Sequence, residues 1–208
     1  ILLYSNLLFG QSKDSLIARD IFTWSLVYSK SYEMLDYLTN RIGGRLSGSP
    51  EAAAAVEWAK REMENSGFDT VYLQEVMVPH WVRGEKEFAQ FVNSTVIGTE
   101  EVPICALGGS IGTGAEGITA KVVGVHNFEE LELLGREQIE GKIVFYNRSM
   151  DPTKINTGAA YGGAVDQRYK GAQEAAKYGA VGVIVRSLTL RKDDYPHTGA
   201  MGYDDNIE

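Results

Sequence analysis

The chain has 208 residues, which is enough for one or two domains with buried cores. Its formal net charge is -8 and it contains no basic run, which argues against nucleic acid as the main partner, because phosphate binding depends on clustered Lys and Arg. The single cysteine, Cys105, excludes an intrachain disulfide and a metal site built from several cysteines.

The chain opens on an apolar run, residues 1–10 (ILLYSNLLFG). This run looks like the remnant of a signal-peptide apolar region with cleavage near Gly10-Gln11, and an ordinary buried segment is the alternative. No other stretch reaches the length needed to span a membrane. The signal-peptide-like run favours an exported protein. There is no initiator Met and no natural stop, so we expect a chain cut at both ends.

Helical periodicity dominates the next part of the chain. Apolar residues recur at helical spacings from Ile21 to Ile42, which predicts one long helix or two, ending at Gly43-Gly44. A polar loop follows, and Ser49 with Pro50 predicts the start of a second helix, because the Ser hydroxyl caps a free amide and Pro needs no amide donor. We expect this helix to stop at Gly67. Residues 71–78 are rich in β-branched side chains and predict a strand.

Strands dominate the second half. Phe88–Ile97, Val102–Leu107 and Ile118–Val125 predict strands, and 127–138 predicts a short helix. Residues 141–148 then predict a buried strand. Residues 171–179 place Ala172, Ala175 and Ala176 on one helical face, and 181–185 predict a second buried strand. This succession of strand, alanine helix and strand is typical of a βαβ-like unit.

Five stretches carry a resemblance to a known family. GKIVFYNR (141–148) and GAQEAAKYGAVGVIVRS (171–187) resemble the protease-associated domain, an insert found in several secreted peptidases. Together with RLSGS (45–49), VPHWVRGE (78–85) and YPHTG (195–199), in this order, they resemble the N-terminal part of secreted zinc exopeptidases of the plasma glutamate carboxypeptidase family. The similarity covers the chain from about Tyr28 to its end.

The resemblance implies an α/β fold in three parts. Residues 1–18 would be a signal-peptide remnant and leader, and 19–90 would supply the N-terminal helices and first strand of an incomplete peptidase domain. Residues 91–208 would form a β-rich protease-associated domain with one or two helices, either complete or cut at its C-terminal end.

The resemblance also implies an activity. The complete protein would be a secreted, extracellular or periplasmic metallopeptidase that hydrolyses short peptides with two zinc ions, with the inserted domain shaping the cleft and a homodimer as a candidate assembly. In the family the zinc ligands and the general base follow the inserted domain. No catalytic or metal residue is therefore assigned here, substrate-binding residues are unknown, and the chain alone is expected to be inactive. The alternative is a non-catalytic protease-associated binding module.

Two glycine motifs match catalytic or cofactor patterns by spacing alone. Residues 112–117 match G-x-G-x-x-G, but a predicted strand follows where dinucleotide binding needs a helix N-terminus, so a turn is the favoured interpretation. Residues 108–112 match G-x-S-x-G, with Asp193 and His197 following in hydrolase order, but the required helix after the serine is not predicted.

The remaining polar candidates are isolated. His80, His126 and His197 form none of the spacings typical of catalytic zinc. Asn93-Ser94-Thr95 and Asn147-Arg148-Ser149 fit the N-glycosylation pattern, and Asn93 is the better candidate because Asn147 ends a predicted buried strand. Cys105 is expected to be a buried structural thiol.

Overall fold

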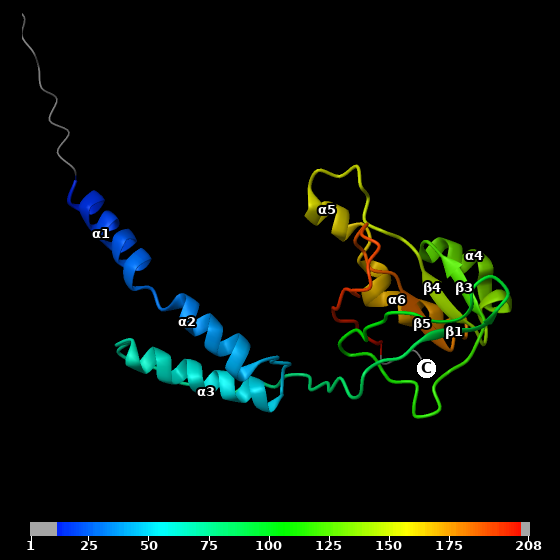
Figure 1. Ribbon diagram of the computed structural model, residues 1–208, viewed down its shortest axis with the longest axis horizontal. Coiled ribbons are helices and arrows are strands. Elements are labelled where there is room, and N and C mark those ends of the chain that lie inside the picture. The colour runs from blue at the N-terminus through cyan, green and yellow to red at the C-terminus, as the bar shows by residue number, and fades with distance from the viewer. Residues whose placement is uncertain (1–11, 205–208) are drawn as a thin grey trace, which may run out of the picture. The chain divides into compact units, whose positions relative to one another are not determined.

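The computed structural model describes residues 12–204, and the chain divides into two compact units, one ending at Val82 and one beginning at Arg83 (Figure 1). The expected signal-peptide remnant at residues 1–10 lies outside the described residues. Among residues 12–204, no helix is both long and apolar enough to cross a bilayer.

Unit 1 begins with helices α1 (Lys13–Tyr28) and α2 (Ser31–Asp36), and α2 continues into a π-helix, η1 (Tyr37–Ile42). The sequence left open one helix or two, and the structure has a break at Ser29-Lys30. The end before Gly43 is confirmed. The start is earlier than expected, because the Ser12 hydroxyl accepts from the Ser15 amide at 3.2 Å and caps α1.

Helix α3 (Pro50–Asn65) forms as the sequence predicts. Ser49 is its N-cap, and the Ser49 hydroxyl accepts a hydrogen bond from the Ala52 amide at 3.1 Å. Glu51 lies in the first turn, where its negative charge complements the positive end of the helix dipole. Tyr37 of η1 stacks on Trp58 of α3 with ring centroids 5.3 Å apart.

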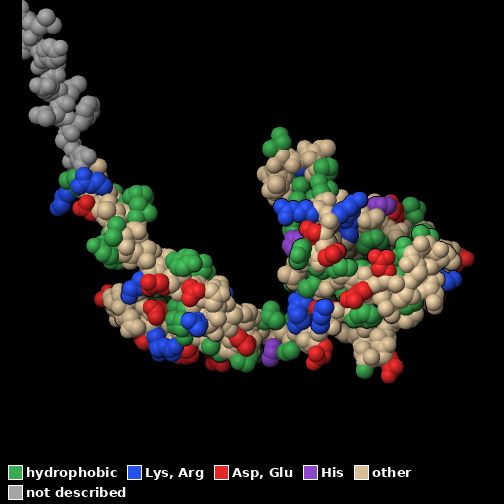
Figure 2. All heavy atoms as spheres, viewed as in Figure 1, with side chains coloured by type: hydrophobic (Ala, Val, Ile, Leu, Met, Phe, Trp, Pro, Cys, Tyr) green, Lys and Arg blue, Asp and Glu red, His purple; other side chains and the backbone are tan. Residues whose placement is uncertain are grey.

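The strand expected at residues 71–78 is not formed, and this stretch has no regular secondary structure. A strand needs a neighbour for its backbone hydrogen bonds, and the described residues of unit 1 form no sheet. No residue in the four helical segments of this unit is buried. Large apolar side chains are exposed instead, among them Trp24 at 61% and Met77 at 94%. Figure 2 shows hydrophobic side chains, in green, on the surface of this unit. Unit 1 therefore has no core of its own among the described residues.

Unit 2 begins with an antiparallel hairpin of β1 (Gln90–Ser94) and β2 (Gly98–Glu101). The strand expected at Val102–Leu107 is not formed. Val102 donates to the Ala89 carbonyl at 2.9 Å, but at Ala106 the backbone is bonded to side chains, since its amide donates to the Glu87 carboxylate at 2.9 Å and its carbonyl accepts from Arg83.

A three-stranded parallel sheet forms the centre of unit 2, in the order β3 (Val122–Val125), β4 (Ile143–Tyr146) and β5 (Gly182–Val185). Helix α4 (Phe128–Ile139) connects β3 to β4, and α6 (Asp166–Ala176) lies between β4 and β5. The βαβ arrangement predicted from the alanine helix and its flanking strands is therefore present.

The register puts one face of each strand into the core. Val125 pairs with Tyr146, and Tyr146 pairs with Val185, so these side chains lie on one face of the pleated sheet. The same face packs against both helices, and six buried residues form the core cluster: Val125, Leu131, Ile139, Val144, Tyr146 and Ala175. The mixed α/β class is confirmed.

A short helix that the sequence did not predict, α5 (Thr157–Gly162), precedes α6. Asn156 caps it, accepting from the Ala159 amide at 3.0 Å. The described part of unit 2 thus has three helices rather than one or two. Helix α5 was missed because six residues are too few to show a helical period.

Candidate functional site

The three histidines lie in different segments of the chain. His80 is in the irregular part of unit 1, His126 follows β3, and His197 lies in the long segment after β5. His126 faces Glu130 at 3.1 Å, and the His126 amide, which donates to the same carboxylate, holds the pKa of Glu130 below its usual value. Across residues 12–204, no group of three or more His, Cys, Asp and Glu side chains could hold a metal ion. The described residues therefore do not fit a zinc centre.

The serine motif at residues 108–112 is not a nucleophile elbow. An elbow presents its serine on a turn between a strand and a helix, and residues 111–121 contain no helix. This segment instead pairs with the end of the chain: Gly108 forms a parallel bridge with Ala200, and the Ile111 amide donates to the Tyr203 hydroxyl at 3.0 Å. Residues 112–117 also continue without a helix, which agrees with a turn.

The main polar cluster of unit 2 centres on Arg168 in α6. This side chain is only 5% exposed, and its guanidinium donates to the carbonyls of His197 and Thr198 and to the Tyr161 hydroxyl. No carboxylate lies within ion-pair distance of Arg168 among the described residues. The positive charge of Arg168 is therefore stabilised by neutral oxygen acceptors. Through these hydrogen bonds the guanidinium holds residues 197–199 against α6.

Gly199 suits this close approach, because a Cβ there would overlap the guanidinium of Arg168, which would have to shift. The same segment is anchored at its other end, where Leu188 is fully buried and the His197 amide donates to the Ser187 hydroxyl at 3.3 Å. Residues 189–198 thus form a surface loop with both ends held, the kind of loop that commonly carries contacts with ligands.

A second buried polar group lies at the start of α6. Arg148 forms an ion pair with Asp166, and the Gln167 side-chain amide donates to the Arg148 carbonyl at 2.5 Å. The Nε of Arg148 and the Oε1 of Gln167 are buried and have no protein partner. This arrangement leaves one donor and one acceptor that suit a bound water.

In unit 1 the loop at residues 45–49 contacts a stretch more than 30 residues further on. The Ser47 hydroxyl donates to the Pro79 carbonyl at 2.6 Å. Gly48 has φ +75°, and a Cβ there would lie 3.1 Å from Cβ of His80. Two stretches that carry the family resemblance, RLSGS and VPHWVRGE, are thereby brought together.

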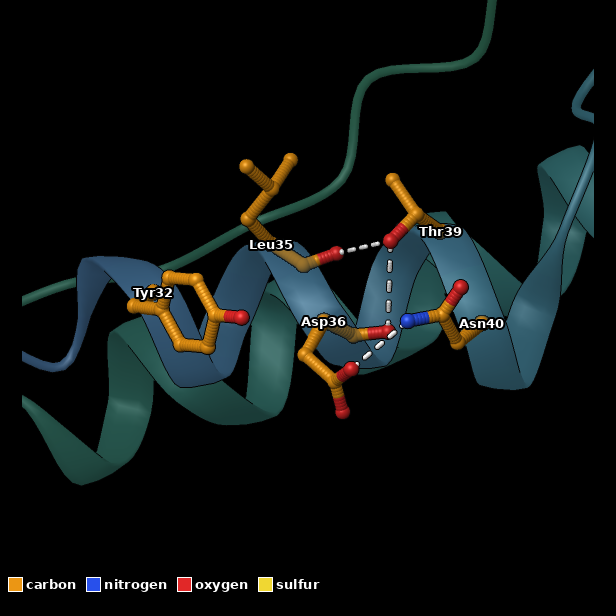
Figure 3. A pocket seen from close by; sticks show the side chains of 5 residues that line it. All are labelled: Tyr32, Leu35, Asp36, Thr39 and Asn40. Atoms are coloured by element: carbon orange, nitrogen blue, oxygen red, sulfur yellow. Dashed lines mark hydrogen bonds between the residues drawn. The ribbon is translucent and has the colours of Figure 1, made fainter.

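A hollow of about 150 Å³ lies along α2 and η1 (Figure 3). Its lining residues all come from this one helical stretch. Three of its polar side chains are bonded within the helix, since Thr39 donates to the Leu35 carbonyl at 2.7 Å and Asn40 donates to the Asp36 carboxylate at 2.6 Å. These groups are already paired, so the hollow presents no converging set of free ligand-binding groups.

Asn93 is exposed and lies near the end of β1 with φ 54°. Asn adopts this left-handed conformation more readily than most residues, which gives Asn93 a structural explanation beside the glycosylation motif. Asn147 is also exposed and accepts from Arg186 at 3.4 Å. Cys105 is half-buried and lies 3.3 Å from the Arg83 guanidinium.

Sequence reasoning missed Arg168, although a signal was available. Extending the apolar stripe of Ala172 and Ala175 by one turn toward the start of the helix reaches Arg168, so an arginine falls on the buried face. A buried arginine needs acceptors, and these come from a loop 29 and 30 residues away, which no local pattern reveals.

Comparisons with known proteins extend these observations. No protein-family model matches the chain. Carboxypeptidase Q from Bos taurus is 36% identical over 199 residues, which are 96% of this chain and 39% of the bovine protein. Carboxypeptidase Q from Homo sapiens is 38% identical over 179 residues, 86% of this chain and 35% of the human protein.

A solved structure agrees with the sequence comparison. The crystal structure of a peptidase M28 precursor from Shewanella amazonensis matches with a TM-score of 0.81 and 32% identity, covering 93% of this chain and 42% of that one. The chain thus spans about two fifths of the length of the relatives it matches. The resemblance indicated by the sequence motifs is confirmed: over most of its length the chain is similar to carboxypeptidase Q and to this M28 peptidase.

Proposed function

We propose that this chain is the N-terminal part of a zinc-dependent exopeptidase that hydrolyses peptide bonds of short peptides. The observation that carries this proposal is similarity to carboxypeptidase Q over 96% of the chain, joined to the fold match with an M28 peptidase at 32% identity. Both proteins are named as peptidases, and both extend well beyond the part matched here.

The metal is assigned to another part of the protein. Residues 12–204 contain no group of side chains that could hold a metal ion, so no catalytic step is derived from them. We propose that two zinc ions are held by residues beyond this chain, and that the 208 residues alone are inactive. Metal-dependent peptidases use such ions to activate water for attack on the carbonyl.

We assign residues 91–208 to a protease-associated domain that lines the cleft and limits the length of the substrate. The parallel sheet with its alanine-faced helix and the anchored loop at residues 189–198 support this assignment. We further propose export of the protein, with glycosylation at Asn93 where the source glycosylates secreted proteins and a homodimer as the assembly to test.

A non-catalytic binding module is the second candidate. It is favoured by one observation, the absence of a metal cluster or a serine elbow from residues 12–204. Against it stands unit 1, whose helices bury no residue and need another surface to cover them.

The coding frame beyond Glu208 separates the two candidates. We expect an H-x-D within roughly the next hundred residues and a Glu-Glu pair after it, the ligand pattern that the family resemblance implies, because a catalytic zinc site needs His, Asp or Glu ligands. A stop codon directly after Glu208 would reject the enzyme and favour the module.

A further inference from the structure

The sequence contains two pairs of adjacent basic residues, and the structure places them in different surroundings. Lys60-Arg61 lies inside helix α3, whereas Arg191-Lys192 lies in the surface loop at residues 189–198. Residues 190–195 are all exposed, and the stretch 186–199 contains no helix or strand. Exposed irregular loops are preferred sites of proteolytic nicking, so a peptidase that recognises basic side chains can reach this second pair.

The backbone of the loop is held by local bonds that an incoming peptidase can replace. The Arg191 amide donates to the Thr189 hydroxyl at 3.2 Å, and the Tyr195 amide donates to the Asp193 carboxylate at 3.2 Å. Both bonds span two residues, so opening them disturbs no other element. An extended segment bound by another protein regains main-chain hydrogen bonds there. The pair in α3 lacks this freedom, because its helical turns would have to unwind first.

Both ends of the loop are attached to the body of unit 2. Before the basic pair, Leu188 is fully buried and its carbonyl accepts from the Met150 amide at 2.9 Å. After the pair, the buried Arg168 guanidinium donates to the carbonyls of His197 and Thr198. A cut between these two attachments would open the loop and release neither end.

Further bonds hold the residues that follow the loop. The Gly108 amide donates to the Gly199 carbonyl at 2.7 Å, and the Gly108 carbonyl accepts from the Met201 amide at 2.9 Å. The Gln173 side chain of α6 donates to the Gly202 carbonyl at 2.9 Å. None of these bonds uses a residue of the exposed stretch 190–195, so they can persist after a cut there.

We propose that Arg191-Lys192 is a processing site for a trypsin-like peptidase, and that cleavage gives a two-chain form in which unit 2 keeps its fold. In this step a peptide C–N bond breaks, the hydroxyl of a water molecule joins the carbonyl carbon, and a proton joins the nitrogen. The products are a new carboxylate and a new amino group. This inference does not depend on the peptidase activity proposed for the protein itself.

The first test is limited digestion of the complete protein, expressed from its full reading frame, with trypsin as the probe and mass spectrometry to identify the fragments. We expect the first cut to fall after Arg191 or Lys192. R191Q/K192Q should slow cleavage in this loop by at least about a hundredfold, because a pocket built for a charged side chain rejects a neutral one. The matched variant K60Q/R61Q should be cut in the loop at the wild-type rate.

A first cut in α3 would overturn the proposal. A first cut after Lys154, which is exposed in another irregular segment, would overturn it as well. So would a protein that trypsin leaves uncut at the loop until it unfolds.

The second test asks whether the ends stay attached, by measuring amide hydrogen exchange before and after the cut. The amides of Gly108 and Met201 both donate hydrogen bonds, and their exchange rates should change by less than about twofold on cleavage of the wild type. Cut R168M is the control that shows the measurement responds. There the Met201 amide should exchange roughly five- to tenfold faster than in the cut wild type, because the loop end has lost a charged donor.

Faster exchange at both Gly108 and Met201 in the cut wild type would overturn the stable two-chain form. Equal exchange in cut R168M and cut wild type would show that Arg168 does not hold this end, and would overturn that part of the proposal.

Discussion

At the scale of single residues, Gly171 and Tyr146 determine how closely α6 approaches the sheet. The fully buried Tyr146 donates from its hydroxyl to the Gly171 carbonyl at 3.0 Å, and its ring lies where a Cβ of residue 171 would be, 2.8 Å from Cε2. The ring also makes an edge-to-face contact with Phe128 of α4. One aromatic side chain therefore joins β4 to both helices.

Gly171→Ala should lower the free energy of unfolding by about 1–3 kcal/mol, because the added methyl group overpacks the core. In an unobstructed helix the same change stabilises by about 1 kcal/mol, so the sign is informative. Gly162→Ala is the control, since a Cβ there has no neighbour within 4 Å. Denaturant unfolding measures both. Equal stability changes in the two variants would contradict the packing described here.

Tyr146 also makes stability depend on alkaline pH. Burial, with smaller contributions from the Glu174 and Asp166 carboxylates, raises the pKa of Tyr146 well above its ordinary value of 10.0. The unfolded chain therefore loses this proton at lower pH than the folded chain. The stabilisation is fully present below about pH 10 and is lost as pH rises above it, by at most about 1.4 kcal/mol per pH unit.

Tyr146→Phe should be less stable than wild type by about 1 kcal/mol at neutral pH, because it loses the hydrogen bond to Gly171. Above about pH 10 its stability should fall less steeply than that of wild type. Unfolding in denaturant at about pH 8 and about pH 11 compares the two slopes. Parallel slopes would show that Tyr146 does not carry this pH dependence.

Arg168 is the residue on which the loop at 189–198 most depends. Arg168→Met should lower the free energy of unfolding by about 1–3 kcal/mol, because the carbonyls of His197 and Thr198 lose a charged donor. The exposed loop should also become more sensitive to proteolysis. Arg136→Met, at a site 59% exposed, should change stability by less than about 1 kcal/mol. Loop cleavage at the wild-type rate in Arg168→Met would contradict the anchoring role.

At the scale of elements, the stability of α3 depends on the hydrogen bond that caps its N-terminus. Ser49→Ala removes the acceptor for the Ala52 amide and should destabilise α3 by about 1 kcal/mol, with lower helicity in circular dichroism. Ser49→Asp should preserve the cap. The loss of helicity should be easy to measure, because no residue of α3 is buried and tertiary packing therefore adds little to the stability of this helix. Unchanged helicity in Ser49→Ala would refute the cap.

Elements defined by local chemistry were predictable from the sequence. Ser49 and Pro50 indicate the start of α3, and the alanine stripe indicates a helix between two parallel strands. The two expected strands that do not form would each have needed a partner strand from another part of the chain. Residues 71–78 have strand composition but no partner strand among the described residues. Within residues 102–107, the Ala106 backbone bonds to the side chains of Arg83 and Glu87 instead of a strand.

The candidate site was less predictable, because its contacts span long sequence separations. Arg168 donates hydrogen bonds to carbonyls about 30 residues further along the chain, and Ser47 donates to the carbonyl of Pro79, 32 residues further along. Nothing in local periodicity encodes such contacts. The sequence spacings of His80, His126 and His197 match no catalytic zinc pattern, but such spacings say nothing of ligands brought together from distant parts of a chain.

At the scale of the whole molecule, the two units differ in how they are stabilised. Unit 2 has a core built on its parallel sheet, whereas the helices of unit 1 leave their apolar side chains exposed. The relatives are more than twice as long as this chain, and the remaining length supplies material that could cover unit 1. The chemistry proposed for the protein belongs to that longer form.

The most direct test of this account measures zinc content and dipeptide hydrolysis together, on the 208-residue chain and on the protein extended to its natural stop codon. We predict that only the extended protein binds about two zinc ions, hydrolyses dipeptides and loses activity to a chelator. Activity in the 208-residue chain alone would contradict the account and would direct attention back to His80, His126 and His197. An extended protein that neither binds metal nor hydrolyses peptides would reject the enzyme in favour of the binding module.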